Sequence, residues 1–257
     1  MKQAQLCEII SIDEIASGIY DVWIRSEAIA RETQPGQFLH IDCGDGINTF
    51  LRRPISICDA VEDRVRFLFE VKGSGTEALA RKKAGDTLDI IGPVGNSFAV
   101  SSDFKRPLVV GGGIGVFPLY LLSKQLHGAE VFLGFRSRDR VVMEKDFTEI
   151  AAQCHIATDD GSYGYAGYAV TLAEEKLKRG EGDILYACGP MPMLRAAKAL
   201  AERYGVKCQL SLEQRMGCGI GACLVCTCET TSKGMNRYKR VCKNGPVFWS
   251  DEVTLND

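Results

Sequence analysis

The chain has 257 residues, of which 46% are hydrophobic and 25% are charged, and its formal net charge is −2 at pH 7. This length allows two or three compact units, and the composition is that of an ordinary globular protein. The balanced charge without a basic run argues against a nucleic-acid partner. The longest apolar stretch, residues 108–122, contains a glycine cluster and a proline. It is too short to cross a bilayer comfortably, so we expect no membrane span.

The first hundred residues alternate apolar and polar positions in short runs, separated by turn residues such as Pro35-Gly36. This pattern predicts a small antiparallel β-barrel of six strands. One helix, from about Thr76 to Lys83, is expected to interrupt the barrel. The predicted strands are residues 5–12, 19–24, 37–41, 56–59, 65–71 and 87–92.

From Arg106 onward, short apolar strands alternate with helices, which predicts a parallel α/β sheet of the Rossmann-like type, covered on both faces. The changes of rhythm divide this multi-domain chain into a barrel domain (1–101), an α/β domain (102–212) and a small cysteine-rich domain (213–257). The predicted α/β strands are residues 107–110, 131–135, 182–188 and 206–212, with helices ending at 126 and spanning 191–204.

Two motifs in the barrel half are typical of flavin binding. Arg53-Pro54-Ile55-Ser56 would place a guanidinium and a hydroxyl on one strand, where they can hold a phosphate and a flavin ring nitrogen. Gly73-Ser74-Gly75-Thr76 opens the predicted helix, whose free N–H groups attract a pyrophosphate. Each motif alone also fits an ordinary structural role, a surface arginine beside a serine and a capped helix start. The presence of both motifs in one barrel predicts bound flavin.

The glycine cluster at residues 111–115 follows a predicted strand and opens a helix, as a dinucleotide site requires. Pro118 stands where the usual fingerprint has its third glycine, so the pattern does not locate a ribose-binding acid. Residues 136–138 either face an adenosine phosphate or form a solvated loop. Cys188 either lies at a ligand-binding strand end or is a small buried side chain. The nicotinamide dinucleotide is assigned to Gly111, Gly113, Gly115, Cys188 and Gly189.

Four cysteines near the C-terminus have the spacing of an iron–sulfur ligand set. Cys218, Cys223 and Cys226 form a C-x4-C-x2-C pattern, and Cys242 follows at a distance. In this arrangement one loop wraps a [2Fe–2S] cluster and a later segment supplies the last thiolate. The glycines between the cysteines permit the tight loop that a cluster needs. Cys228 is an alternative to Cys226 as the third ligand.

A zinc site or disulfide bonds would also use cysteines such as these. Structural zinc sites favour paired short knuckles, whereas here the first gap is long and the fourth cysteine stands alone. The chain has eleven cysteines, an odd number, and its first residues lack the apolar core of a secretory signal. Free thiols and a cluster together favour a reducing, cytoplasmic location.

The order of these features resembles the ferredoxin reductase family over essentially the whole chain. Within that family the chain is similar to the electron-transfer subunits of type B, NAD-dependent dihydroorotate dehydrogenases, in residues 53–58, 158–164 and 212–223. The resemblance implies cluster ligands at Cys218, Cys223, Cys226 and Cys242. Glu70 departs from the basic or neutral residue expected there, so only a backbone contact to FAD carries over at that position. The implied FAD site comprises Arg53, Pro54, Ile55, Ser56, Leu68, Phe69, Glu70, Gly75 and Thr76.

The resemblance also implies a function in pyrimidine (UMP) biosynthesis. Electrons would pass from the FMN of a dihydroorotate dehydrogenase catalytic subunit through the [2Fe–2S] cluster and FAD to NAD⁺, in a two-plus-two assembly. Flavin stands between the other two centres because nicotinamide exchanges hydride and a cluster exchanges single electrons. No residue of this chain is expected to act as a catalytic acid or base.

Two alternative functions remain, and the residues leave NAD and NADP open. The same architecture resembles the reductase subunit of a sulfide dehydrogenase or of a ferredoxin–NADP transhydrogenase complex. In another class, the chain is a redox-sensing or electron-carrier module that binds a cluster and does not turn over nicotinamide.

Overall fold

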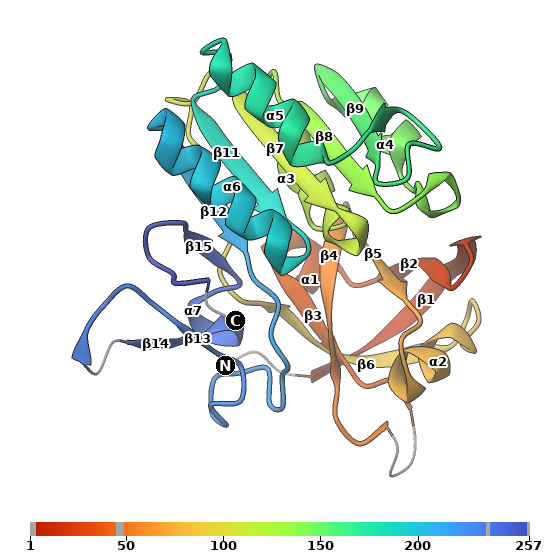
Figure 1. Ribbon diagram of the computed structural model, residues 1–257. Helices are drawn as coiled ribbons and strands as arrows, with labels where there is room; N and C mark the ends of the chain where they lie inside the picture. The colour runs from red at the N-terminus through yellow and green to blue at the C-terminus, as the bar shows by residue number, and fades with distance from the viewer. Residues whose placement is uncertain (1–3, 45–48, 235–236, 256–257) are drawn as a thin grey trace.

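The computed structural model describes residues 4–44, 49–234 and 237–255. An N-terminal barrel lies below a mostly parallel sheet with helices on both faces, and the C-terminal segment packs beside both (Figure 1). The predicted fold class, a barrel followed by an α/β domain and a small cysteine-rich domain, is confirmed. Among the helices of these ranges, none is both long enough and apolar enough to cross a membrane.

Six antiparallel strands close the barrel in the order β1-β2-β5-β4-β3-β6. In β5, Val65, Phe67 and Phe69 point into the barrel core because strand side chains alternate, while Leu68 is buried on the other side, against the α/β sheet. The barrel elements are β1 (Ala4–Ala16), β2 (Ile19–Arg25), α1 (Glu27–Glu32), β3 (Phe38–Ile41), β4 (Arg53–Val61), β5 (Arg64–Glu70), α2 (Ser74–Ala80) and β6 (Thr87–Val94).

The central sheet has the strand order β10-β9-β8-β7-β11-β12-β15. The order reverses between β7 and β11, and ligands of such sheets bind beyond the carboxyl ends of the strands at this point. The strands are β7 (Pro107–Gly112), β8 (Glu130–Phe135), β9 (Gln153–Thr158), β10 (Tyr165–Ala166), β11 (Ile184–Cys188), β12 (Lys207–Ser211) and β15 (Val247–Trp249).

Four helices cover the two faces of this sheet. Side chains of α3 (Leu119–Gln125) and α4 (Glu144–Ile150) share one buried cluster with the sheet, and those of α5 (Ala169–Lys178) and α6 (Met191–Tyr204) share the other. Two short 3₁₀ turns, η2 (Gly113–Val116) and η3 (Arg138–Arg140), follow β7 and β8. The turns therefore lie at the carboxyl edge of the sheet, where the glycine cluster was expected to act.

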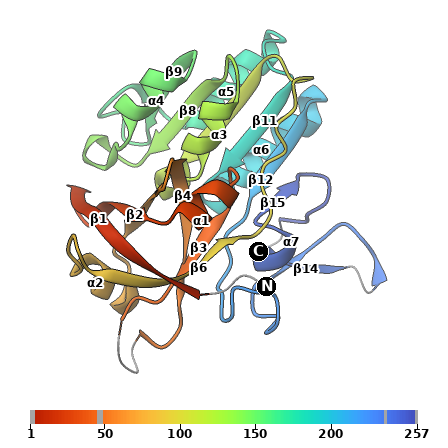
Figure 2. The same cartoon turned by 180° about the vertical axis from the view of Figure 1, so that it is seen from behind.

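The C-terminal segment is attached to the rest of the molecule by its last strand. It forms a small sheet of β13 (Thr227–Glu229) and β14 (Tyr238–Arg240), then α7 (Val241–Asn244), before β15 pairs antiparallel with β12. Seen from behind, this segment lies beside the barrel and under the sheet (Figure 2). Its path brings the cysteine-rich region next to the barrel and to the carboxyl edge of the sheet.

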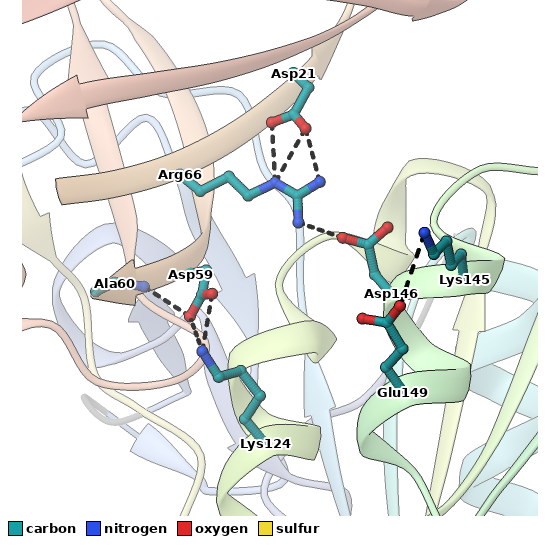
Figure 3. A network of polar contacts seen from close by, with 8 residues as sticks. All are labelled: Asp21, Asp59, Ala60, Arg66, Lys124, Lys145, Asp146 and Glu149. Atoms are coloured by element: carbon teal, nitrogen blue, oxygen red, sulfur yellow. Dashed lines mark hydrogen bonds and ion pairs between the residues drawn. The ribbon is translucent and has the colours of Figure 1, made fainter. Parts of the chain in front are cut away.

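Charged side chains join the barrel to the α/β sheet. Arg66 on β5 binds Asp21 on β2 and Asp146 on α4, with N–O distances of 2.7 and 2.5 Å (Figure 3). The side chains of Arg66 and Asp21 are only 11% and 14% exposed. Lys124 on α3 binds both carboxylate oxygens of Asp59 on β4 at 2.9 Å. We call these two groups the charged joint.

Candidate functional site

A cavity of about 260 Å³ lies where the barrel, the central sheet and the C-terminal segment meet. Its barrel wall comes from β4 and β5, whose side chains were predicted to hold FAD. All of the predicted FAD residues except Gly75 line this cavity: Arg53, Pro54, Ile55, Ser56, Leu68, Phe69, Glu70 and Thr76. The structure thus brings together residues that lie in three separate segments of the sequence.

Gly75 lies behind this wall and supports Arg53. A Cβ atom added to Gly75 would lie 2.5 Å from Nε of Arg53, so a larger residue would displace the guanidinium from this position. Arg53 also donates a hydrogen bond to the carbonyl of Leu51. The Thr76 hydroxyl accepts from the N–H groups of Lys72 and Gly73, at 2.9 and 3.2 Å. Gly73 is the N-cap of α2, so the Thr76 side chain caps the N-terminus of this helix from the first turn.

The opposite wall of the first cavity comes from strand ends that the motifs did not single out. Ile114 and Phe117 follow β7, and Ser211 and Glu213 lie at the end of β12. The carboxyl ends of parallel strands meet at one edge of a sheet, so the observed strand order brings these positions together. Cys188, at the end of β11, also lines this cavity. Burial, and then the charge of Glu213, raises the pKa of its thiol to about 12.

A second cavity, of about 860 Å³, extends from the first along the glycine turn. Of the residues assigned to the dinucleotide, Gly113, Gly115 and Gly189 line it. Gly111 is packed against Val116 and Leu119, and Cys188 lines the first cavity instead. A Cβ on Gly115 would lie 2.5 Å from the carbonyl oxygen of residue 188, so this turn requires glycine to approach β11.

Both charge signs are present at this second cavity. Arg136 and Ser137 of the predicted loop line it, while the Arg138 guanidinium lies over the ring of Tyr163, 5.4 Å from its centroid. Arg140 forms an ion pair with Glu70 of the barrel, and Lys72 lies 3.2 Å from the same carboxylate. The crevice between the two domains is therefore crossed by one ion pair beside the glycine turn.

The four predicted ligand cysteines form two close pairs. The N–H groups of Ala222 and Cys223 donate to the sulfur of Cys218, at 3.2 and 3.4 Å, and the Cys218 N–H donates to the sulfur of Cys223. The N–H of Cys242 donates to the sulfur of Cys226 at 3.4 Å. A [2Fe–2S] cluster takes two protein thiolates on each iron, so two pairs fit it.

The surroundings of the Cys218 thiol favour the thiolate form that binds iron. Burial alone would raise the pKa of Cys218, but hydrogen bonds from the backbone of Cys223, Ile220 and Ala222 outweigh it and lower the pKa to about 6. In the described part of the chain, no group of three or more His, Cys, Asp or Glu side chains is arranged to hold a single metal ion. All eleven cysteines are free, so the disulfide alternative is wrong.

The structure bears on the choice between Cys226 and Cys228. Burial and a side-chain hydrogen bond with Cys226 raise the pKa of Cys242 to about 12, and the charge of Cys218 raises this pKa as well. Cys228 lies on β13 opposite Lys239, and its thiol is raised to a pKa of about 11, mainly by burial. The geometry therefore favours Cys226 as the partner of Cys242.

The barrel, the switch-point cavities and the paired cysteines define a ferredoxin-reductase type of electron-transfer protein with an added cysteine loop. The family model for the iron–sulfur cluster binding domain of dihydroorotate dehydrogenase B matches residues 213–254. The dihydroorotate dehydrogenase B (NAD(+)) electron transfer subunit of Caldanaerobacter subterraneus subsp. tengcongensis is 41% identical over 255 residues, which cover 98% of this chain and 99% of that one. The corresponding subunit of Geobacillus kaustophilus is 44% identical over 251 residues, covering 94% and 95%.

A solved structure is similar over nearly the whole chain. The NADH-dependent reduced ferredoxin–NADP oxidoreductase, studied for flavin-based electron bifurcation, superposes with a TM-score of 0.86 at 31% identity, covering 99% of this chain and 92% of that one. The chain belongs to the family of dihydroorotate dehydrogenase B electron transfer subunits. Its predicted membership of this family is confirmed.

Proposed function

We propose that this chain accepts electrons from the FMN of a dihydroorotate dehydrogenase catalytic subunit and delivers them to NAD⁺, using a [2Fe–2S] cluster and FAD. When bound, the cluster exchanges single electrons and FAD converts them into hydride. The observation that carries the proposal is the first cavity. Its walls come from the barrel, from the carboxyl edge of the sheet and from residues 213–216, which lead directly into the cysteine loop. One cavity thus joins all three parts of the chain.

The barrel wall would bind and orient FAD. The Arg53 guanidinium, supported by Gly75, supplies a positive charge for a phosphate, and the Ser56 hydroxyl supplies a hydrogen bond to the ring. The backbone of residues 68–70 would border the ring from β5. Leu68 and Phe69 are buried, so this wall excludes water from one side of the cavity. The motif residues would then bind FAD, as the resemblance to the family implies.

The sheet edge would hold the dinucleotide. Gly113, Gly115 and Gly189 let the backbone approach a pyrophosphate closely, and the second cavity beside them continues into the first. Because its pKa is about 12, the Cys188 thiol stays uncharged at neutral pH. An uncharged thiol thus lies at the end of β11, on the sheet side of the first cavity.

The cysteine loop offers a contact surface for the electron donor. Ile220, Leu224 and Val225 are 55%, 61% and 55% exposed, and they surround the exposed Cys223. Exposed apolar side chains clustered in this way are typical of protein–protein contacts. We infer that the FMN-containing catalytic subunit docks here, in a two-plus-two assembly. With the partner docked there, Cys218 and Cys223 would lie on the donor side of the molecule.

A second function has support from the comparison with the ferredoxin–NADP oxidoreductase. A chain of this fold could serve as the reductase subunit of a transhydrogenating complex, because that structure is similar over 99% of this chain. The two functions need different partners. A partner that binds dihydroorotate supports the first, and a partner that exchanges electrons with ferredoxin supports the second.

The decisive experiment is co-purification with the catalytic partner, followed by an assay of dihydroorotate-dependent NADH formation. We expect flavin and cluster absorbance, NADH formation, and rapid NADH-dependent reduction of an artificial dye. Cys223→Ala should lose iron and sulfide, whereas Cys228→Ala, the matched control, should keep both. Full iron content in Cys223→Ala would contradict the ligand assignment. A complex without dihydroorotate-dependent NADH formation would contradict the function.

A further inference from the structure

His40 is a buried histidine that the function proposed above does not use. In β3, Leu39 and Ile41 point into the barrel core, so His40 points outward, yet it is only 1% exposed. Its cover is the cysteine loop. A Cβ on Gly219, next to Cys218, would overlap Nδ1 of His40, so the loop backbone rests directly on the imidazole ring.

The same histidine is joined to the strand that carries the flavin motif. His40 pairs with Pro54 of β4, between Arg53 and Ile55. One residue therefore contacts the cysteine loop through its side chain and the FAD wall through its backbone neighbour. His40 therefore connects the two proposed cofactor sites directly.

Within the described ranges, neither ring nitrogen of His40 has a hydrogen-bond partner at normal distance and angle. The backbone of Arg52 interacts with the ring and opposes the lowering of its pKa by burial. A neutral imidazole carries one N–H donor and one acceptor, and a buried donor without a partner is unfavourable. Gly219 approaches Nδ1 most closely, so this nitrogen faces the loop that bears Cys218. A sulfur held in that loop would satisfy it.

We propose that His40 is a positioning residue for the cluster: its uncharged ring fixes the cysteine loop against β3 and donates a hydrogen bond to a sulfur at the Cys218 end. The inference rests on the function proposed above. A hydrogen bond to a sulfur stabilises the reduced cluster, which is more negatively charged, and so raises its reduction potential. The barrel would thereby tune the centre from which the flavin receives electrons.

The test compares His40→Leu, which removes the donor, with His40→Gln, which keeps an N–H at similar reach. His155→Gln is the control, because the His155 ring is half-buried and stacks on Phe132. Its strand, β9, lies far from the C-terminal segment (Figure 1). The readouts are iron per flavin, the EPR spectrum of the reduced cluster, and its midpoint potential by EPR-monitored titration of the holoprotein.

We expect His40→Leu to shift the midpoint potential to a more negative value, alter the EPR spectrum and slow reduction of the cluster by NADH about tenfold. His40→Gln should restore most of each quantity, and His155→Gln should change none. His40→Leu could lose iron altogether. In that case, retention of iron by His40→Gln supports the proposal, whereas loss of iron from both variants contradicts the proposed hydrogen bond. An unchanged potential and spectrum in His40→Leu overturns the proposal. An unsubstituted protein without cluster or flavin would instead contradict the proposed function.

Discussion

The barrel is joined to its two neighbours in different ways. On the α/β side, the charged joint uses buried ion pairs, with Arg66 held between Asp21 and Asp146. On the side of the C-terminal segment, the contacts are uncharged: His40 lies under Gly219, and Asn96 bonds to the backbone of Asn244 and Val247. We call this second set the neutral joint.

The difference follows from what each joint must hold. A buried ion pair requires all of its partners, so the charged joint fixes two rigid units in one arrangement. Cations beside the cysteine loop come from the C-terminal segment itself: Arg240 donates to the carbonyl of Gly221, and the side chain of Lys243 lies against Gly221. The barrel residues of the neutral joint are uncharged, so they add packing and hydrogen bonds beside these cations. Charge and hydrogen bonding both set the potential of a centre held there.

Breaking the charged joint should give the largest effect on stability. Arg66→Met leaves two carboxylates, Asp21 and Asp146, without their partner, and removing one member of a buried ion pair costs about 3–5 kcal/mol. The free energy of unfolding, from urea titration, measures this loss. Arg25→Met is the control, because its pairs with Glu8 and Asp63 are exposed and contribute about 0–1 kcal/mol. Equal losses in the two variants would contradict the role given to burial.

Breaking the neutral joint at Asn96 should have a smaller and more local effect. The Asn96 side chain donates to the carbonyls of Asn244 and Val247, at 3.1 and 2.7 Å, and accepts from the Val247 N–H at 3.0 Å. Asn96→Ala removes all three bonds, and we expect a loss of about 2–3 kcal/mol. Hydrogen exchange of the Val247 amide should accelerate first, while amides of β8 keep their protection. Ser101→Ala, which loses bonds only to Asp103, is the control.

The neutral joint also shows where prediction from sequence ended. The six barrel strands, the glycine turn and the cysteine spacing could be predicted, because each depends on a local pattern. The cover over His40 could not, because Gly219 lies far away in the chain. Phe38-Leu39-His40-Ile41 has the alternation of an ordinary strand with one polar outward position. Only the folded chain reveals that the outward position is buried.

Other elements were missed for similar physical reasons. Helix α5 buries Ala169, Ala173 and Leu177, and two alanines give too little hydrophobic contrast to mark a helix face. Strand β15 has three residues, and its place beside β12 depends on the path of the whole C-terminal segment. Glu213 and Ile114 reach the first cavity because β7 and β12 end at one edge, and strand order is not written in either local sequence.

The buried ring of His40 should make stability depend on pH. Burial, then the charge of Arg52 and, less strongly, of Arg53, lowers the pKa of His40 to about 4, although the Arg52 backbone opposes the shift. An unfolded histidine has a pKa of about 6.5, so between these values the unfolded chain binds a proton that the folded chain does not. The free energy of unfolding therefore falls as pH falls, by about 2 kcal/mol from pH 6.5 to pH 5.

The measurement is the difference in this pH slope between the unsubstituted protein and His40→Gln, which cancels contributions from other groups. Parallel slopes in the unsubstituted protein and His40→Gln would show that the ring is protonated when folded, or that the cysteine loop opens above pH 5.

The smallest expected effect concerns the ion pair that crosses the crevice between the barrel and the sheet. Glu70 neutralises Arg140, and both side chains line the second cavity, where an anionic dinucleotide would lie. Glu70→Gln leaves the Arg140 charge uncompensated, so we expect the Kd for NADH to fall about threefold. This factor corresponds to the free energy that a partly exposed ion pair contributes. The Kd comes from titration of the holoprotein with NADH.

Two observations separate this charge effect from a structural one. The gain in affinity should shrink as salt is added, because the ions screen partly exposed charges. Glu62→Gln, which loses only an exposed pair with Arg64 at the turn between β4 and β5, should leave the Kd unchanged. Weaker NADH binding in Glu70→Gln would mean that the ion pair shapes the crevice, because its loss would then let the barrel wall move away from the glycine turn.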